Sequence, residues 1–209
     1  GILLATTLGI GGILVIDVVT FVFAVLSVLV VFVPQPPPSA AGRAGQGNLW
    51  QESVYGFIFI WTRKSLLGVQ LCFTISNFFG SMAFILVTPM ILLRTGNSEA
   101  TVGLVQSFMG VGGVVGGLLM SIWGGPRPRI HGVLAGFILT GILGEALMGV
   151  GQTLPVWLAA AFFSLFFIPF LNGSNQSIWQ TKVAPDVQGR VFATRRLIAQ
   201  VTGPIGMLI

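Results

Sequence analysis

Two carboxylates lie inside long apolar stretches of the sequence, where they are candidates for chemistry. These are Asp17 and Glu145, and the amide of Asn77 lies near the middle of a third apolar stretch. A charge in hydrocarbon is costly, so an ionisable residue at such a position is by default a functional candidate. A carboxyl can bind a proton on one side of a membrane and release it on the other, while an amide can bond a small molecule.

Depth within each stretch separates the three candidates. At ~1.5 Å per residue, Asp17 lies ~6 Å from the start of its stretch, Asn77 ~16 Å and Glu145 ~22 Å. Asp17 therefore fits a helix-end anchor or pairing partner better than a transport role. For Glu145 a proton site and a structural role both stay open. For Asn77 substrate contact and an interhelical hydrogen bond both stay open.

The sequence contains no set of residues that indicates catalysis, metal binding or a phosphate loop. Its one cysteine, Cys72, and its one histidine, His131, have no companions at metal-ligand or nucleophile–base spacing. We therefore expect no enzyme, no cofactor and no metal. The net charge of +5 comes from basic residues in short gaps between apolar runs, not on one face, so nucleic acid is not an expected partner.

The elements that carry these residues must be membrane helices. The 209 residues are 54% hydrophobic and only 7% charged, with a mean hydropathy of +0.95, whereas a soluble domain is about a quarter charged. A span needs about 20 apolar residues, and five stretches qualify: 13–33, 66–93, 101–123, 130–150 and 154–179. The expected fold is an all-α polytopic membrane helix bundle. Residues 1–10 and 197–209 are expected to be parts of two further helices, so that the bundle is truncated at both ends.

The basic residues are sorted to one side of this arrangement. With alternating spans, loops 34–65, 124–129 and 180–196 share a side that holds nine of the ten basic residues. These nine are Arg43, Arg63, Lys64, Arg127, Arg129, Lys182, Arg190, Arg195 and Arg196. Arg94 alone falls on the other side, with a turn at Gly11. By the positive-inside rule the first side is cytoplasmic.

The long loop 34–65 has two parts. Residues 34–38, P-Q-P-P-P, favour an extended polyproline linker. Residues 49–64 mix aromatic and charged side chains, which suits an amphipathic helix in the membrane interface. An early start of the next span is the alternative.

Small residues and prolines indicate how the spans pack. Gly112 and Gly116, and likewise Gly113 and Gly117, place small residues on a strip of one span. Residues 132 and 136 repeat the spacing. A sliding surface between moving helices and static packing both remain open. Pro89 and Pro169 each remove a backbone hydrogen bond and predict kinks in their spans.

Two segments carry a resemblance to a known family. Residues 169–174, P-F-L-N-G-S, and 185–192, P-D-V-Q-G-R-V-F, are similar to runs in helix ten and before helix eleven of the major facilitator superfamily. The branch that holds macrolide-efflux proteins and the enterobactin exporter is the most similar. The resemblance covers nearly the whole chain. One departure is Pro126 and Pro128 in loop 124–129, where that branch carries an acidic residue.

The resemblance implies an organisation and a function. Residues 1–33 would end an N-terminal six-helix half, 34–65 would form the cytoplasmic linker and interfacial helix, and 66–209 would belong to the C-terminal half. The function would be secondary active, proton-coupled efflux of an amphipathic small molecule through the cell membrane. Its partners would be the lipid bilayer, the substrate and protons. A non-transporting membrane scaffold or sensor and a channel are the alternatives.

The loop before helix eleven carries the last candidate site. Asp186, Gly189 and Arg190 lie within the P-D-V-Q-G-R run. Because Asp186 and Arg190 are four residues apart, a local ion pair that caps a helix start is one interpretation. A cytoplasmic gate between inward and outward states is the other.

The charge partition predicts which loops an external reagent can reach. Single cysteines that replace Gln46, Arg127 or Gln188, in a background without Cys72, should resist an impermeant thiol reagent added to intact cells. The measurement is labelling before and after permeabilisation. Labelling of any of the three in intact cells would contradict the topology.

Overall fold

The computed structural model describes residues 2–30 and 49–207, and all its regular elements in these ranges are helices. The expected all-α membrane helix bundle is confirmed. The chain divides into two compact units, Gly1–Pro37 and Pro38–Ile209. The expected polyproline linker, residues 34–38, and Arg43 lie outside the described residues.

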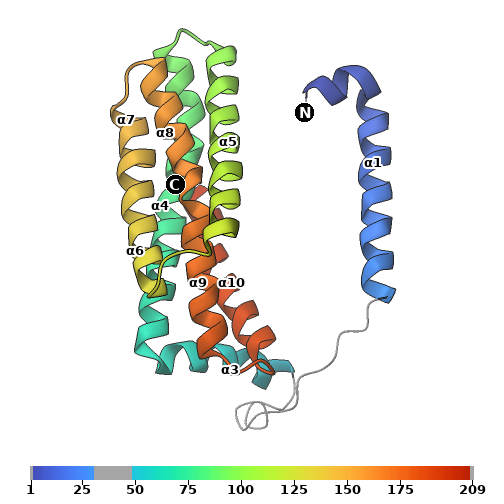
Figure 1. Cartoon of the computed structure of the whole chain (residues 1–209), viewed down its shortest axis with the longest axis vertical. Coiled ribbons are helices and arrows are strands. Elements are labelled where there is room, and N and C mark those ends of the chain that lie inside the picture. Colours follow the sequence, from blue (N-terminus) through green and yellow to red (C-terminus); the bar gives the residue numbers. More distant parts are fainter. Residues whose placement is uncertain (1, 31–48, 208–209) are drawn as a thin grey trace. The chain divides into compact units, whose positions relative to one another are not determined.

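The first unit consists of one helix, α1 (Ile2–Val30), drawn in blue in Figure 1. The expected turn at Gly11 is wrong, because α1 continues through Gly11 and Gly12. Backbone groups in hydrocarbon have no partner except one another, so a glycine pair in an apolar run stays helical. The apolar part of α1, Leu14–Val30, is the described portion of the span expected at 13–33. Asp17 is exposed on it.

In the second unit, four helical stretches are long and apolar enough to cross a membrane. They confirm the other four expected spans. The first two are α4 (Lys64–Arg94) and α5 (Glu99–Trp123). The third, Arg129–Val150, joins α6 (Arg129–Leu139), a π-helix η1 (Thr140–Ala146) and α7 (Leu147–Val150). The fourth, Leu154–Lys182, joins α8 (Leu154–Phe166) and α9 (Ile168–Lys182).

Two of these stretches are irregular. The fourth breaks at Phe167, two residues before Pro169, which confirms the kink expected from that proline. Pro89, in contrast, lies within an uninterrupted α4. The π-helix was not predicted, since its wider turn leaves no mark in hydropathy.

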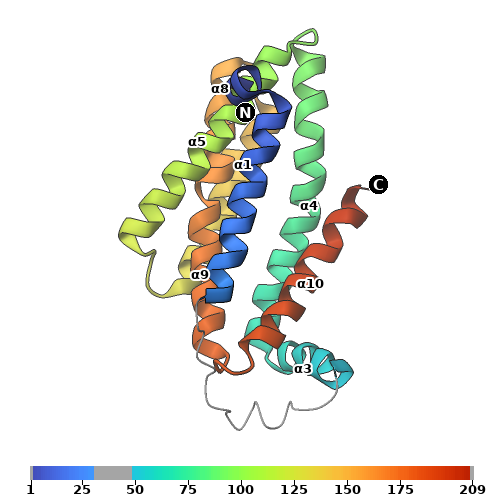
Figure 2. The same ribbon diagram turned by 90° about the vertical axis from the view of Figure 1, so that its right-hand side faces the viewer.

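Helices α3 (Leu49–Thr62) and α10 (Gln188–Met207) are the other two helices in the described residues of the second unit. In Figure 2, α3 lies across the foot of the bundle, and only Arg63, with φ −106° and ψ 89°, separates it from α4. The alternative of an early start of the next span is therefore wrong. Helix α10 begins at Gln188, so the loop expected at 180–196 shrinks to 183–187. Hydropathy placed this boundary too late, because glutamine and arginine are polar yet good helix formers.

The basic residues of the second unit are placed as expected along the bundle. Arg94 lies at the end opposite α3, where its Nη1 donates to the carbonyl oxygens of Gly149 and Gly151 at 3.0 and 2.8 Å. Arg63 and Lys64 lie at the α3 end, where the Arg63 guanidinium is 3.5 Å from the ring centroid of Phe59.

Glycines set the closest helix contacts. Gly112 and Gly116 on α5 lie directly against the backbone carbonyls of Phe162 and Phe166 on the α8 side. An added Cβ at either position would collide with those oxygens. Gly113 has ordinary room beside Leu165, and nothing lies within 4 Å of a Cβ at Gly117. One strip of the expected glycine pattern therefore faces a helix, and the other is more open.

Two apolar cores lie at opposite ends of the second unit. One joins α3, α4, α9 and α10 through buried side chains that include Phe59, Ile60, Trp179 and Val191. The other joins α4, α5, α7 and α8 through Ile91, Val105, Met148, Trp157 and their neighbours.

The glycine contact predicts a difference between two neighbouring substitutions. Gly116→Ala should lower the free energy of unfolding by ~1–3 kcal/mol, because the methyl group forces α5 away from a backbone oxygen. Gly117→Ala adds a methyl group with no atom within 4 Å of it. It should therefore change the free energy of unfolding by less than ~0.5 kcal/mol. Thermal unfolding of the purified protein in detergent measures both. Equal effects of the two substitutions would show that α5 and α8 are not packed through Gly116.

Candidate functional site

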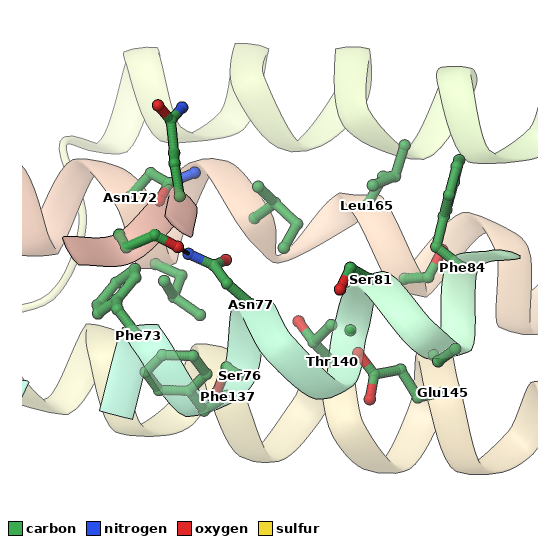
Figure 3. A pocket seen from close by; sticks show the side chains of 18 of the residues that line it. Phe73, Ser76, Asn77, Ser81, Phe84, Phe137, Thr140, Glu145, Leu165 and Asn172 are labelled. Carbon is green, nitrogen blue, oxygen red and sulfur yellow. Dashed lines mark hydrogen bonds between the residues drawn. The ribbon is translucent and has the colours of Figure 1, made fainter. Parts of the chain in front are cut away.

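A cavity of about 1320 Å³ lies within the second unit, between α4 on one side and η1, α8 and α9 on the other, with α10 at one end. Figure 3 shows its lining from close by. Its apolar wall includes Phe73, Phe84, Phe137 and Leu165. Polar groups alternate with these: Ser76, Asn77, Ser81, Thr140, Glu145 and Asn172. The cavity is thus suited to a molecule with both apolar and polar parts.

Asn77 lies in the wall of the cavity on α4. Its Nδ2 donates to the carbonyl oxygen of Ala199 on α10 at 3.1 Å. The interhelical hydrogen bond that the sequence left open is therefore present, and the side chain is exposed to the cavity as well. Asn77 can position α10 and contact a bound molecule at once.

Glu145 lies in the π-helix η1 and faces the same cavity. Figure 3 shows its carboxylate beside the side chains of Thr140 and Ser81. A Cβ added at Gly80 would lie 3.7 Å from its Oε1, so the absence of a side chain there leaves room for the carboxylate. Within residues 2–30 and 49–207, no basic side chain is paired with Glu145. The side chain is exposed to the cavity.

Thr140 begins the π-helix and is buried, with 8% of its surface exposed. Within the described part of the chain, its Oγ1 has no hydrogen-bond partner. On α9, Asn175 is 2% exposed, and its Oδ1 likewise lacks a partner there. Buried polar atoms are normally satisfied, and both of these residues line the cavity. The two oxygen atoms themselves are covered by protein, so they lie beside the cavity without facing it.

A polar cluster at the α10 end of the cavity was missed by sequence reasoning. Gln70, which is buried on α4, donates from Nε2 to the carbonyl oxygen of Arg195 at 3.0 Å. Arg195 donates from Nη1 to Oε1 of Gln176 at 3.0 Å, and its guanidinium lies 5.3 Å from the ring centroid of Trp179. From the sequence, Arg195 was expected only as one of the basic residues of a loop. No local pattern indicates its contact with Gln70, which lies 125 positions away.

Arg195 lies outside the four spanning stretches. Burial lowers its pKa, and the positive charge of the adjacent Arg196 lowers it further. A guanidinium still stays protonated at physiological pH. The α10 end of the cavity is therefore positively charged.

The remaining candidate residues lie apart from Glu145. Asp186 lies in the turn between α9 and α10, and Gly189 and Arg190 lie in the first turn of α10. Of these, Gly189 lines the cavity. Asp17 belongs to the first unit. The structure thus brings Asn77, Glu145 and Gly189 around one space.

Comparison with known proteins gives curated relatives that are similar to this chain, among them two from different organisms. Macrolide efflux protein A of Enterococcus faecalis is 25% identical over 205 residues, which cover 93% of this chain and 60% of that protein. Macrolide efflux protein A of Streptococcus pyogenes is 24% identical over 207 residues, which cover 94% of this chain and 48% of that protein. This chain is similar to macrolide efflux proteins. The resemblance inferred from the sequence is confirmed, and the relatives are named as transporters rather than as enzymes.

The similarity has a defined extent. The chain spans about half to three-fifths of the length of these relatives. No protein-family model and no solved structure matches it.

The Arg195 cluster predicts that two adjacent arginines differ in their effect on stability. Arg195→Lys should lower the unfolding free energy by ~1–2 kcal/mol, because lysine cannot bond Gln176 and lie flat over Trp179 at once. Arg196→Lys, at an exposed position, should change it by less than ~0.5 kcal/mol. The measurement is the thermal unfolding midpoint in detergent. Indistinguishable midpoints would mean that the cluster does not hold α10 in place.

Proposed function

We propose that this chain forms part of a secondary active exporter of amphipathic small molecules in the cell membrane, with macrolides as the first class to test. The observation that carries the proposal is the cavity, which mixes aromatic rings, amides and one carboxylate inside a membrane helix bundle. The names of the relatives, macrolide efflux proteins, support export as the direction of transport and macrolides as the substrate class.

The size and lining of the cavity support a large amphipathic substrate. Small-molecule pockets are roughly 300–1,000 Å³, and this cavity, at about 1320 Å³, is larger. Its aromatic side chains can cover an apolar surface, and the exposed amides of Asn77 and Asn172 offer donors and acceptors to hydroxyl and carbonyl groups. In a protein as long as the relatives, the part outside this chain would form a second wall. Rocking of the two walls about the cavity would expose it to each side in turn.

Glu145 is the proposed proton site of this transporter. It lies on a π-helix, and such wide turns in otherwise regular helices are frequent at functional sites. The cavity gives its carboxylate access to both substrate and water. A proton bound there from outside and released inside would drive export, since each charge that moves down a potential of 100 mV supplies ~2.3 kcal/mol.

The local gate proposed for this transporter is the segment from Asp186 to Arg190. Gly189 lines the cavity at the start of α10, so movement of this turn changes access to it. Asp17 is proposed as a helix anchor.

Exchange of Glu145 tests proton coupling. Glu145→Gln keeps the shape and hydrogen-bonding capacity of the side chain but cannot titrate, so proton-driven macrolide export should fall to background while the folded yield is retained. Glu99→Gln is the matched control, because Glu99 lies in the first turn of α5 and does not line the cavity. The measurement is macrolide flux in vesicles under an imposed pH gradient, made with the full-length protein that includes the part outside this chain, and the parent is that same protein without the substitution.

Four outcomes of that assay are informative. Saturable export that is lost in Glu145→Gln and kept in Glu99→Gln supports the whole proposal. Normal export with an unchanged pH profile in Glu145→Gln would exclude Glu145 as the proton site but would not contradict the proposed export function. No flux in the parent protein would favour a scaffold or sensor, and non-saturable flux would favour a channel.

A further inference from the structure

A second hollow, separate from the cavity, lies on another face of the second unit. It has a volume of about 530 Å³ and is bounded by the C-terminal end of α5, one face of α6 and the junction of α8 with α9. We call this hollow the aromatic groove, after Trp123, Phe166, Phe167 and Phe170. None of the residues proposed for transport lines it.

The walls of the aromatic groove are almost entirely apolar. The rings of Trp123 and Phe170 have centroids 6.1 Å apart, and those of Phe166 and Phe170 are 5.7 Å apart. Gly132 and Gly136 on α6 lie against Ser174 and Leu171 of α9 and give the groove a floor without side chains. The break at Phe167 turns three phenylalanines of one stretch toward the same space. Such a groove on a membrane helix bundle accommodates a hydrocarbon chain.

Two arginines adjoin the mouth of the groove in the sequence, although neither lines it. Pro126 and His131 line it, and Arg127 and Arg129 lie between them in the sequence. The side chain of Arg129 is bonded to the carbonyl of Gly124, which fixes it beside the loop, while Arg127 is exposed. Residues 120–131 contain no acidic residue. The arginines thus lack an acidic neighbour in their own segment.

An apolar groove with cations at its mouth complements one kind of molecule. We propose that the aromatic groove binds an anionic phospholipid, with an acyl chain along the phenylalanines and the phosphate at Arg127, Arg129 and His131. The groove lies where α5 ends and α6 begins, which is at a boundary of the hydrocarbon layer, and Trp123 is the residue type enriched there. Anionic lipids are concentrated in the cytoplasmic leaflet, on the side where the charge partition puts loop 124–129.

Quenching of Trp123 tests the site directly, because Trp123 lines the groove. The purified protein is placed in nanodiscs that contain phosphatidylglycerol or phosphatidylcholine with brominated acyl chains. The Trp123 signal is the difference between the parent and Trp123→Phe. Phosphatidylglycerol should quench it at a several-fold lower mole fraction than phosphatidylcholine, and added salt should narrow that difference.

Two variants and one control assign the preference to the groove. Arg127→Gln should reduce the preference for phosphatidylglycerol by ~5-fold, the effect of one basic residue near a membrane surface. Ala135→Phe, which fills the groove, should reduce quenching by both lipids. Lys182→Gln removes a basic residue that does not line the groove and should leave the preference unchanged. Gel filtration and the thermal midpoint show that each variant is folded.

The contrary results are equally clear. Equal quenching by the two lipids, or a preference that is unchanged by Arg127→Gln combined with Arg129→Gln, would overturn the proposal. In another outcome, the brominated lipid is displaced by a macrolide and not by unlabelled phosphatidylglycerol. That result would indicate that the groove binds a transported substrate rather than a phospholipid. Neither result depends on whether the cavity transports, so this test and the flux assay fail independently.

Discussion

Hydrocarbon leaves backbone N–H and C=O groups no partner except one another, and the rest of this structure depends on that constraint. It makes every described regular element a helix and keeps α1 helical through Gly11 and Gly12. It also limits where the backbone can depart from an α-helix. The departures at η1 and Phe167 lie beside the cavity and the aromatic groove, inside the packed bundle rather than at arbitrary positions.

Close packing at glycines then decides where space remains. Contacts of Gly112 and Gly116 with the carbonyls of Phe162 and Phe166 hold α5 tightly against the α8 stretch. Helices α4 and α10 form a separate pair, joined by Gln70 and Asn77 to backbone carbonyls of α10. The cavity lies between these two pairs, and the two apolar cores join α4 to the rest of the bundle at either end of it. Space therefore remains in the middle of the bundle, between packed ends.

The sequence predicted the fold class and four of the spans because both follow from composition and from runs of at least ~20 apolar residues. It failed where long-range packing decides. The start of α10 was placed too late, because hydropathy does not register the helix propensity of Gln188 and Arg190. The π-helix around Glu145 depends on neighbours such as Ser164, which meets Gly144 closely. Of the site, Asn77 and Glu145 were found from their position in apolar runs. Arg195, Gln176 and Gln70 were not, because their pairing joins distant segments.

The central claim is that the cavity binds the transported molecule, and protection of one cysteine tests it most directly. Ser76 lines the cavity on α4, whereas Ser107 on α5 is exposed and lines neither the cavity nor the aromatic groove. Ser76→Cys and Ser107→Cys, each in a background without Cys72, are treated with a thiol reagent with and without saturating macrolide. We expect the macrolide to slow the labelling of the cysteine at position 76 and to leave the labelling rate at position 107 unchanged. Equal labelling rates at position 76 with and without the macrolide would contradict the central claim.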